Sequence, residues 1–348
     1  MLRERIEGKW IDAFVNTFRH CNVQEGEVCA ILSETQSREV NVQLAELALN
    51  ALGAKAYHIV LPTPRQTAPA PVRSTGASDA IQHMGPVVNA LAETSFVVDC
   101  TVEGMLHAEE LPKILKGGAR VLMVSNEHPE ALERLTVDET LEGKVKLGIK
   151  MLRDAKEMRV TSPAGTDLTI NIEKAPAGGG WGYIKRGGLI SHWPGGLCLC
   201  FPAKNCVNGT FVMNTGDVNL TFKRYVDRPI TMTIENDYIT DIKGDGVDAE
   251  LFKSYIDAWG DREAYAVSHV GWGMNPAARW DALTAYDKTQ VQGTELRAFA
   301  GNFVYSTGAN EVAGRHTLGH FDLPCRNHTV ELDGTPVVIE GKLQGDLA

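Results

Sequence analysis

The sequence lacks any apolar run that approaches the roughly 20 residues a bilayer-spanning helix needs. It also lacks the continuously apolar stretch of a secretory signal, because its start, MLRERIEGKWIDAF, is charged. No cluster of lysine and arginine stands out, and 34 basic against 44 acidic residues give a net charge of −10. These absences argue against export and against membrane or nucleic acid as a partner, so we expect a cytoplasmic protein.

Disulfide and zinc-finger patterns are missing as well. The seven cysteines are odd in number, and none of them forms Cys-x-x-Cys, which favours reduced thiols in a reducing compartment. Cys198 and Cys200 form the one close pair, in the apolar run LCLCF. Their spacing predicts that both face one side of a strand, where core packing is the simpler role.

Two common catalytic signatures are also absent. The glycine-rich segment 178–196, GGGWGYIKRGGLISHWPGG, has no Gly-Lys-Ser/Thr ending and is therefore no phosphate-binding loop. Ser306, in GNFVYSTGAN, has no Gly-x-Ser-x-Gly around it, which disfavours a serine hydrolase. The glycines predict a mobile loop near a ligand. Trp181, Tyr183 and the proline-rich loop 63–77 are candidates for a lid or an interface.

What the sequence does contain predicts two domains. A chain of 348 residues that is 43% apolar exceeds one typical domain. In its first part, short apolar runs alternate with segments of helical period, which predicts a parallel sheet covered by helices. We expect strands at 27–33, 55–62, 95–100 and 119–125, and helices at 38–52, 79–92, 108–115 and 138–156. Residues 1–156 are accordingly predicted to be an α/β domain.

The pattern changes beyond residue 156. Segments such as TDLTINIE and ITMTIENDYITDIKG alternate apolar and polar side chains and are separated by Gly, Asp and Asn turns. One helical stretch, 247–259, interrupts them. Residues 157–348 are predicted to be an α+β catalytic domain with an antiparallel or mixed sheet.

A possible metal site lies near the end of the chain. His320 and Asp322 stand in HTLGHFDLPCRN, and alternate residues of a strand point the same way, so both can bind one ion. His269, in YAVSHVGWGMNP, is a candidate third ligand. Two histidines and one carboxylate form the facial triad of Fe(II) enzymes, which leaves positions open for substrate and O2, although zinc and manganese accept the same ligands.

The same residues allow a structural interpretation. His-x-Asp is a weak motif, and Asp322 capping a turn beside locally hydrogen-bonded histidines would explain it equally well. His316 could compete with His320 through His-x-x-x-His, but nearby glycines and Pro324 make a helix there implausible. We expect His316 and His328 to be surface residues.

Three further residues are candidates for catalysis. His192 is flanked by Trp193 and Pro194, and its imidazole could exchange protons near pH 7 or simply hold the loop by hydrogen bonds. His107 follows a predicted strand, where open α/β sheets gather ligands, although it could instead cap a helix. Ser306 could donate to a substrate oxygen or cap its turn.

Four segments together resemble a known family: YAVSHVGWGMNPAARW, RAFAGNFVYSTGAN, ISHWPGG and HFDLPCRN. They are similar to the 2,5-dihydroxypyridine 5,6-dioxygenases, the ring-cleaving enzymes of nicotinate catabolism. The resemblance is most specific over 265–328 and weaker in the first third. It implies a fold shared with thermophilic metallo-aminopeptidases, an Fe(II) cofactor, an aromatic N-heterocycle and O2 as substrates, N-formylmaleamate as product, and a homo-oligomer such as a hexamer.

The resemblance also implies roles for single residues. The iron ligands correspond to His269, His320 and Asp322. The active-site histidines correspond to His192 and His107, the pocket serine to Ser306, and a leucine before the second active-site histidine to Leu106. The stretch before the His-Trp-Pro motif has no acidic residue, which leaves a substituted hydroxypyridine as an alternative substrate.

Two other functions stay open at this point. A single-metal aminohydrolase or aminopeptidase-like enzyme would use the same fold and ligands to activate water. A binding protein without catalysis would use the histidines only structurally, and it would purify without stoichiometric metal.

Overall fold

Short apolar runs in the first third of the chain form a parallel sheet. The computed structural model describes residues 5–65 and 78–348, so most of the predicted loop 63–77 lies outside the described residues. The sheet has the order β2-β1-β3-β4-β8, and all its pairs are parallel. Its strands are β1 (Val28–Glu34), β2 (Lys55–Leu61), β3 (Phe96–Cys100), β4 (Arg120–Met123) and β8 (Leu189–His192). The four predicted strands are confirmed.

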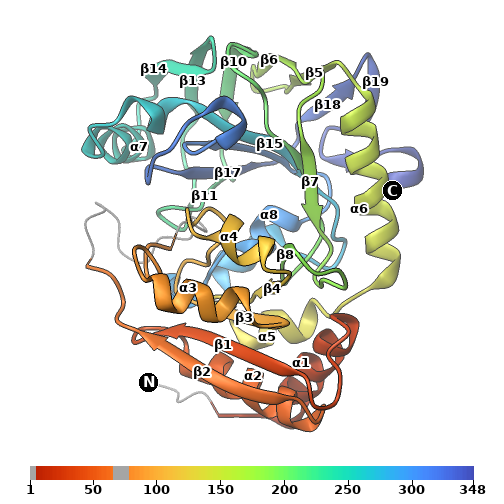
Figure 1. The fold of residues 1–348 in the computed structure, drawn as a ribbon. Coiled ribbons are helices and arrows are strands. Elements are labelled where there is room, and N and C mark those ends of the chain that lie inside the picture. Colours follow the sequence, from red (N-terminus) through yellow and green to blue (C-terminus); the bar gives the residue numbers. More distant parts are fainter. Residues whose placement is uncertain (1–4, 66–77) are drawn as a thin grey trace.

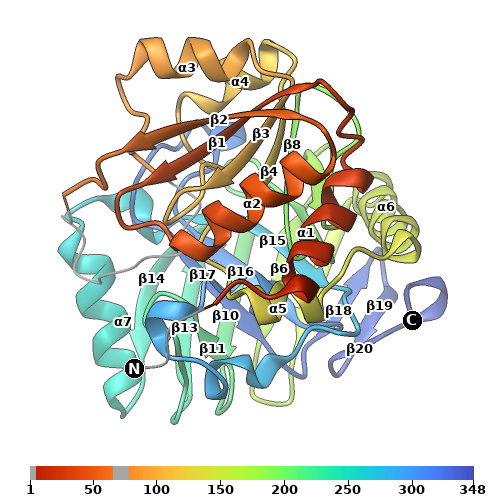
Figure 2. The same ribbon diagram turned by 90° about the horizontal axis from the view of Figure 1, so that it is seen from below.

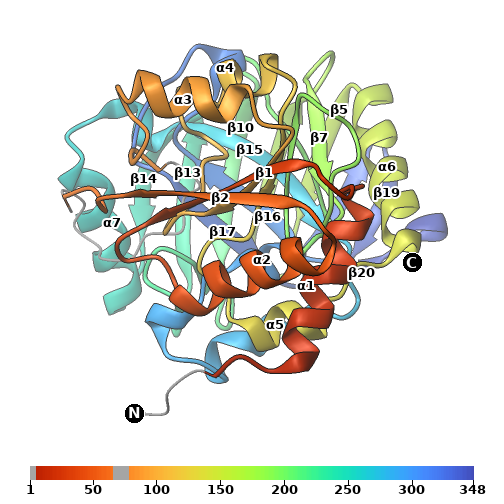
Figure 3. The same cartoon turned by 60° about the horizontal axis from the view of Figure 1, so that its bottom comes forward.

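Helices cover both faces of this sheet, as Figures 1 and 2 show. One face carries α1 (Gly8–His20), α2 (Glu39–Ala51) and α5 (Pro129–Arg134), and the other carries α3 (Gly85–Ala92) and α4 (Leu111–Lys116). Alternate strand residues separate the two cores: Cys29 and Ile31 pack toward α1 and α2, whereas Ala30 and Leu32 pack toward α3 and α4. Figure 3 shows α1, α2 and α5 together on one side of the sheet, below β1 and β2 in that view.

The structure corrects one predicted helix and adds another. The helix predicted from residue 79 begins only at Gly85, because Pro86 fits the first turn of a helix and not its interior. Helix α1 was not predicted, although Trp10, Phe14 and Phe18 recur every four residues and are buried.

The second part of the chain builds two large antiparallel sheets that pack face to face (Figure 1), besides a two-stranded one of β11 (Val218–Asn219) and β12 (Arg224–Tyr225). The larger sheet contains β14 (Tyr238–Lys243), β13 (Ile230–Glu235), β10 (Val207–Met213), β6 (Asp167–Asn171), β5 (Glu157–Thr161), β18 (Thr329–Leu332), β19 (Thr335–Ile339) and β20 (Lys342–Leu343), in that order. The smaller contains β17 (Phe321–Cys325), β16 (Phe303–Thr307), β15 (Val267–Gly273), β9 (Leu197–Cys200) and β7 (Ala177–Gly180).

One large core joins these sheets with α6 (Glu139–Asp154) and α7 (Val247–Ala258), close to the predicted helices 138–156 and 247–259. Asp138 caps α6 by accepting a hydrogen bond of 2.8 Å from the Thr140 amide. In β9, Cys198 and Cys200 pack into this core while Leu197 and Leu199 face the other side. Core packing of the two cysteines is therefore confirmed.

Strand β8 pairs with β4 of the parallel sheet although it lies beyond residue 156. The predicted division into 1–156 and 157–348 stays a proposal, and the parallel sheet contains one strand from the second part. In the part of the chain that is described, no helix has the length and apolar character needed to span a bilayer.

The prediction that His328 is a surface residue is wrong. Its side chain is buried, its Nδ1 lies 2.9 Å from the Arg326 carbonyl, and its Nε2 lies 3.0 Å from the Thr166 hydroxyl. A carbonyl can only accept, so Nδ1 carries the proton. Two hydrogen bonds thus satisfy a neutral imidazole in the core. His316 is exposed, as expected.

The buried His328 should make stability depend on pH. Burial lowers its pKa from the ordinary 6.5 to about 4. Between those values the unfolded chain takes up a proton that the native protein does not, so the unfolding free energy falls as pH falls from 6.5 to 4. The full effect is about 3 kcal/mol. In denaturant titrations at pH 7.5 and pH 4.5, His328→Gln should lose less stability on acidification than the wild type.

The exposed His316 provides the control for this experiment. His316→Gln should leave the difference between the two pH values as it is in the wild type. A His328→Gln protein with the wild-type loss of stability on acidification would contradict the assignment.

Candidate metal centre and cavity

Two strands of the smaller sheet, β15 and β17, bring the candidate ligands together on either side of β16. Asp322 lies on β17 with His320 two residues earlier, and Ser306 is the direct partner of Asp322 on β16. His269 lies on β15, where the pairing with β16 shifts register between Val267 and Val270. Val267 and Val270 are three residues apart, but their partners on β16, Thr307 and Tyr305, are only two residues apart. His269 therefore lies in a β-bulge.

The structure brings His269, His320 and Asp322 together. The Nε2 atoms of His320 and His269 lie 3.2 Å and 3.7 Å from Oδ1 of Asp322. His107, from the loop after β3, joins them: one ring nitrogen from each of the three histidines lies within 4.8 Å of the others. The ring centroids of His107 and His320 are 5.1 Å apart. Side chains from the parallel sheet's β3 loop and from the smaller antiparallel sheet thus meet at one point.

This group of side chains fits a metal ion. Ligand atoms of a six-coordinate ion with bonds of about 2.1 Å lie roughly 3 Å apart, close to the separations between Oδ1 and the two Nε2 atoms. The Nε2 atom of His320, which lies beside the Asp322 carboxylate, is buried and has no hydrogen-bond partner among the described residues. Unsatisfied imidazole nitrogens beside a carboxylate are suited to an ion and its bound water.

The electrostatics keep these groups in the protonation states that metal binding requires. Burial lowers the pKa of His269 to about 3 and that of His107 well below its ordinary value. Burial alone would raise the pKa of Asp322, but Arg297 and the neighbouring imidazoles outweigh it and hold this pKa well below its usual range. The neutral imidazoles of His269 and His107 therefore lie beside an ionised carboxylate.

A cavity of about 1240 Å³ opens in front of this centre. His107, His192, His269 and Asp322 line it, and so does Leu106. Apolar side chains form one wall: Leu197, Leu199 and Phe201. The Phe201 ring meets His269 edge to face, with centroids 5.5 Å apart. A flat aromatic molecule would therefore contact the apolar wall and the candidate ligands at once.

His192 lies in the same cavity at the end of β8. Its Nδ1 is 2.6 Å from the Pro194 carbonyl oxygen, so Nδ1 donates and Nε2 keeps its lone pair. Burial lowers its pKa, which leaves the ring neutral at pH 7. The predicted glycine-rich loop is here partly strand, β7 and β8. Gly180 permits the arrangement, because a Cβ there would stand 2.7 Å from Nε2 of His192.

Three other residues with predicted roles are Ser306, Tyr183 and Trp181, and the structure does not place all of them at the cavity. Ser306 is fully buried, and its hydroxyl donates to Oδ1 of Asp322, so its contact with a substrate stays a prediction. Tyr183 is not available as a lid or interface residue, because it is buried against α1 and donates to Glu142. Trp181 is half-buried and lines the cavity.

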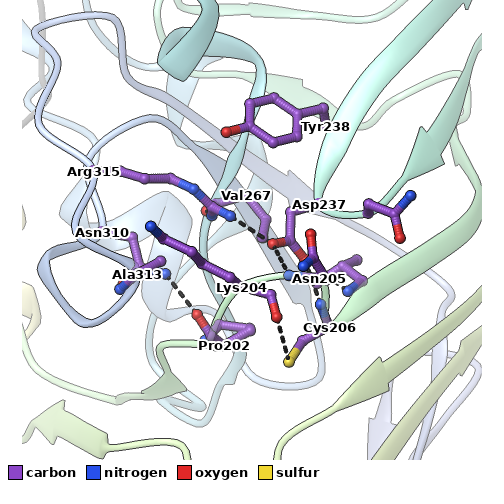
Figure 4. A network of polar contacts seen from close by, with 12 residues as sticks. Pro202, Lys204, Asn205, Cys206, Asp237, Tyr238, Val267, Asn310, Ala313 and Arg315 are labelled. Carbon is purple, nitrogen blue, oxygen red and sulfur yellow. Dashed lines mark hydrogen bonds and ion pairs between the residues drawn. The ribbon is translucent and has the colours of Figure 1, made fainter.

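A polar network that sequence reasoning missed fixes the segment leading to His320 (Figure 4). The carboxylate of Asp237 accepts hydrogen bonds from three successive amides, residues 205 to 207, and from Arg315. Arg315 also donates to the Val267 carbonyl, at 2.9 Å. The side-chain amide of Asn310 donates to the carbonyls of Pro202 and Ser268, both at 2.9 Å. The segment is thus tied to the start of β15, next to His269.

Sequence comparison agrees with this site. Residues 9–345 match the family model described as 2,5-dihydroxypyridine 5,6-dioxygenase. The chain is 35% identical to the 2,5-dihydroxypyridine 5,6-dioxygenase of Pseudomonas putida KT2440 over 332 residues, which cover 94% of each protein.

Structural comparison gives the same result. The solved 2,5-dihydroxypyridine dioxygenase of Pseudomonas putida KT2440 superposes with a TM-score of 0.90 at 33% identity, covering 97% of both chains. AmpT from Thermus thermophilus matches with a TM-score of 0.66 at 15% identity over 97% of this chain and 99% of its own, and it shares the fold. This agrees with the aminopeptidase-like fold expected from the sequence. The chain belongs to the 2,5-dihydroxypyridine 5,6-dioxygenase family of enzymes.

Proposed function

We propose that the protein is an Fe(II)-dependent dioxygenase that opens the ring of 2,5-dihydroxypyridine between carbons 5 and 6 to give N-formylmaleamate. The convergence of His269, His320 and Asp322 at a large cavity, which His269 and Asp322 line, carries the proposal. Membership of a family named for this reaction indicates which substrate to expect. The reaction adds both atoms of O2 to the ring compound and needs no further reactant.

His269, His320 and Asp322 are the residues that would hold the ion. When bound there, Fe(II) supplies a common site for a ring hydroxylate and O2 and a path for electron density between them. The apolar wall formed by Leu199 and Phe201 would bind the flat ring and exclude water. His107, beside the ligands on the cavity side, would orient substrate and oxygen, and Leu106 would restrict the space around them.

His192 would act as general base and then as general acid. The Pro194 carbonyl holds the proton on Nδ1, so Nε2 is the atom that can accept the proton of a ring hydroxyl. Nε2 can later return that proton to the product. Because burial lowers the pKa of His192, its neutral form dominates at pH 7, as a base requires.

Gly180→Ala tests whether the exact position of His192 matters. The new Cβ would stand 2.7 Å from Nε2, so the imidazole must move. We expect kcat to fall on the order of 10-fold to 100-fold, with iron content unchanged, because small displacements of catalytic groups are costly. Gly178→Ala on the same strand is the matched control, since its Cβ would meet no atom within 4 Å and turnover should persist. Equal activity of the two variants would count against the positional requirement.

Oxygen uptake by anaerobically iron-loaded protein on addition of 2,5-dihydroxypyridine tests the function directly. We expect one O2 consumed for each substrate molecule, with parallel loss of the substrate's ultraviolet absorption. No uptake with iron bound would overturn this substrate, and substituted hydroxypyridines would then be assayed. Hydrolysis of amide or peptide substrates without oxygen uptake would favour the metallohydrolase alternative, which shares the fold of AmpT.

The resemblance to the family also leads us to propose a homo-oligomer. Light scattering after size-exclusion chromatography measures its mass directly. A species of 37.9 kDa, the mass of one chain, at micromolar concentration would overturn the proposal.

A further inference from the structure

The two carboxylate oxygens of Asp322 have different partners. Oδ2 accepts a hydrogen bond of 2.5 Å from Nε of Arg297, while Oδ1 accepts one from the Ser306 hydroxyl. Oδ1 is also the oxygen closest to the histidines, at 3.2 Å from His320 Nε2 and 3.7 Å from His269 Nε2. One oxygen therefore faces the metal ligands, and a guanidinium group covers the other.

The fold holds both Asp322 and Arg297 in place. The Asp322 side chain is 4% exposed and that of Arg297 12% exposed. Arg297 lies on α8 (Thr294–Ala298), and the Asn302 side chain donates to the carbonyls of Leu296 and Arg297, which ties α8 to the start of β16. Little solvent competes for the Arg297–Asp322 contact, and charge-assisted hydrogen bonds of this kind are strong.

We propose that Arg297 is a positioning residue that reserves Oδ1 of Asp322 for the metal, so that the carboxylate binds through one oxygen. The inference rests on the proposed function. A carboxylate that binds through both oxygens occupies two positions around an ion, which would leave a two-histidine site with about two open positions instead of three. Arg297 keeps the third position open by holding Oδ2 away, and a substrate that binds together with O2 needs that room.

The number of water molecules on the bound metal is the readout, and Mn(II) is the probe because its effect on water-proton relaxation scales with that number. The wild type should bind one Mn(II) per chain and show the relaxivity of about three exchanging waters. In Arg297→Met, Oδ2 is released to the ion, and the relaxivity per bound Mn(II) should fall by about one third. Arg297→Lys keeps a cationic donor and should retain most of the wild-type relaxivity.

The outcomes separate the inference from the function on which it rests. Wild-type relaxivity in Arg297→Met at equal Mn(II) occupancy would overturn the role of Arg297. If that variant does not fold, the wild type alone decides, because a value for two waters would show that both oxygens of Asp322 already bind. Failure of the wild type to bind Mn(II) or Fe(II) at all would overturn the metal centre and, with it, this inference.

Discussion

His320→Ala is expected to remove iron from the protein and to abolish turnover. His320 supplies a buried imidazole with Nε2 3.2 Å from Oδ1 of Asp322, and its ring nitrogens belong to the cluster that also contains His107 and His269. Loss of an outer partner of a metal ligand already costs about 10-fold to 100-fold in affinity, and loss of the ligand itself should cost more. Iron per chain after anaerobic loading and desalting measures the effect.

His316→Ala is the matched control for this prediction. His316 lies four residues earlier on the same segment but is exposed, so its removal should leave iron stoichiometry at the wild-type level. A His320→Ala protein that still bound one iron per chain would mean that the ligand set is wrong. His107 would then be the first residue to test, because it lies beside the same atoms.

His192→Ala should lower kcat by about 100-fold to 10,000-fold while iron binding stays normal. The residue lines the cavity, but it is not one of the three histidines whose nitrogens gather at the candidate ion site. Its contribution should therefore appear in the proton-transfer step and not in metal affinity. Steady-state oxygen uptake with iron content measured on the same sample separates the two.

Added imidazole offers a test of mechanism for this variant. If the lost group is a base, free imidazole should restore part of the turnover in His192→Ala and leave the wild type unchanged. Full turnover of the variant without imidazole would rule out proton transfer by His192.

Features that depend on local sequence pattern were predictable here. Strands β1, β3 and β4 of the parallel sheet are mainly apolar runs, and their burial on both faces explains this composition. The spacing of His320 and Asp322 indicated two side chains on one face, and the geometry brings them close together. Helix α1 also has a local signal, the four-residue period of Trp10, Phe14 and Phe18.

Features that depend on distant contacts were not predictable. The pairing of β8 with β4 joins segments about 70 residues apart, and nothing in LISH specifies it. Arg297 reaches Asp322 across 25 residues through the placement of α8. The burial of His328 depends on Thr166, which is 162 residues away. Polar residues become buried when tertiary packing supplies their partners, and the sequence around them does not reveal this.

The bulge at His269 makes the length of β15 as important as its composition. Val267 and Val270 both pack into the core although two residues separate them, because the bulge places Ser268 and His269 together opposite one residue of β16. Removing Ser268 would restore regular pairing with β16 and would remove the local distortion that sets the position of the imidazole relative to Asp322. A relative with every candidate ligand but without this extra residue would therefore not be expected to assemble the same centre.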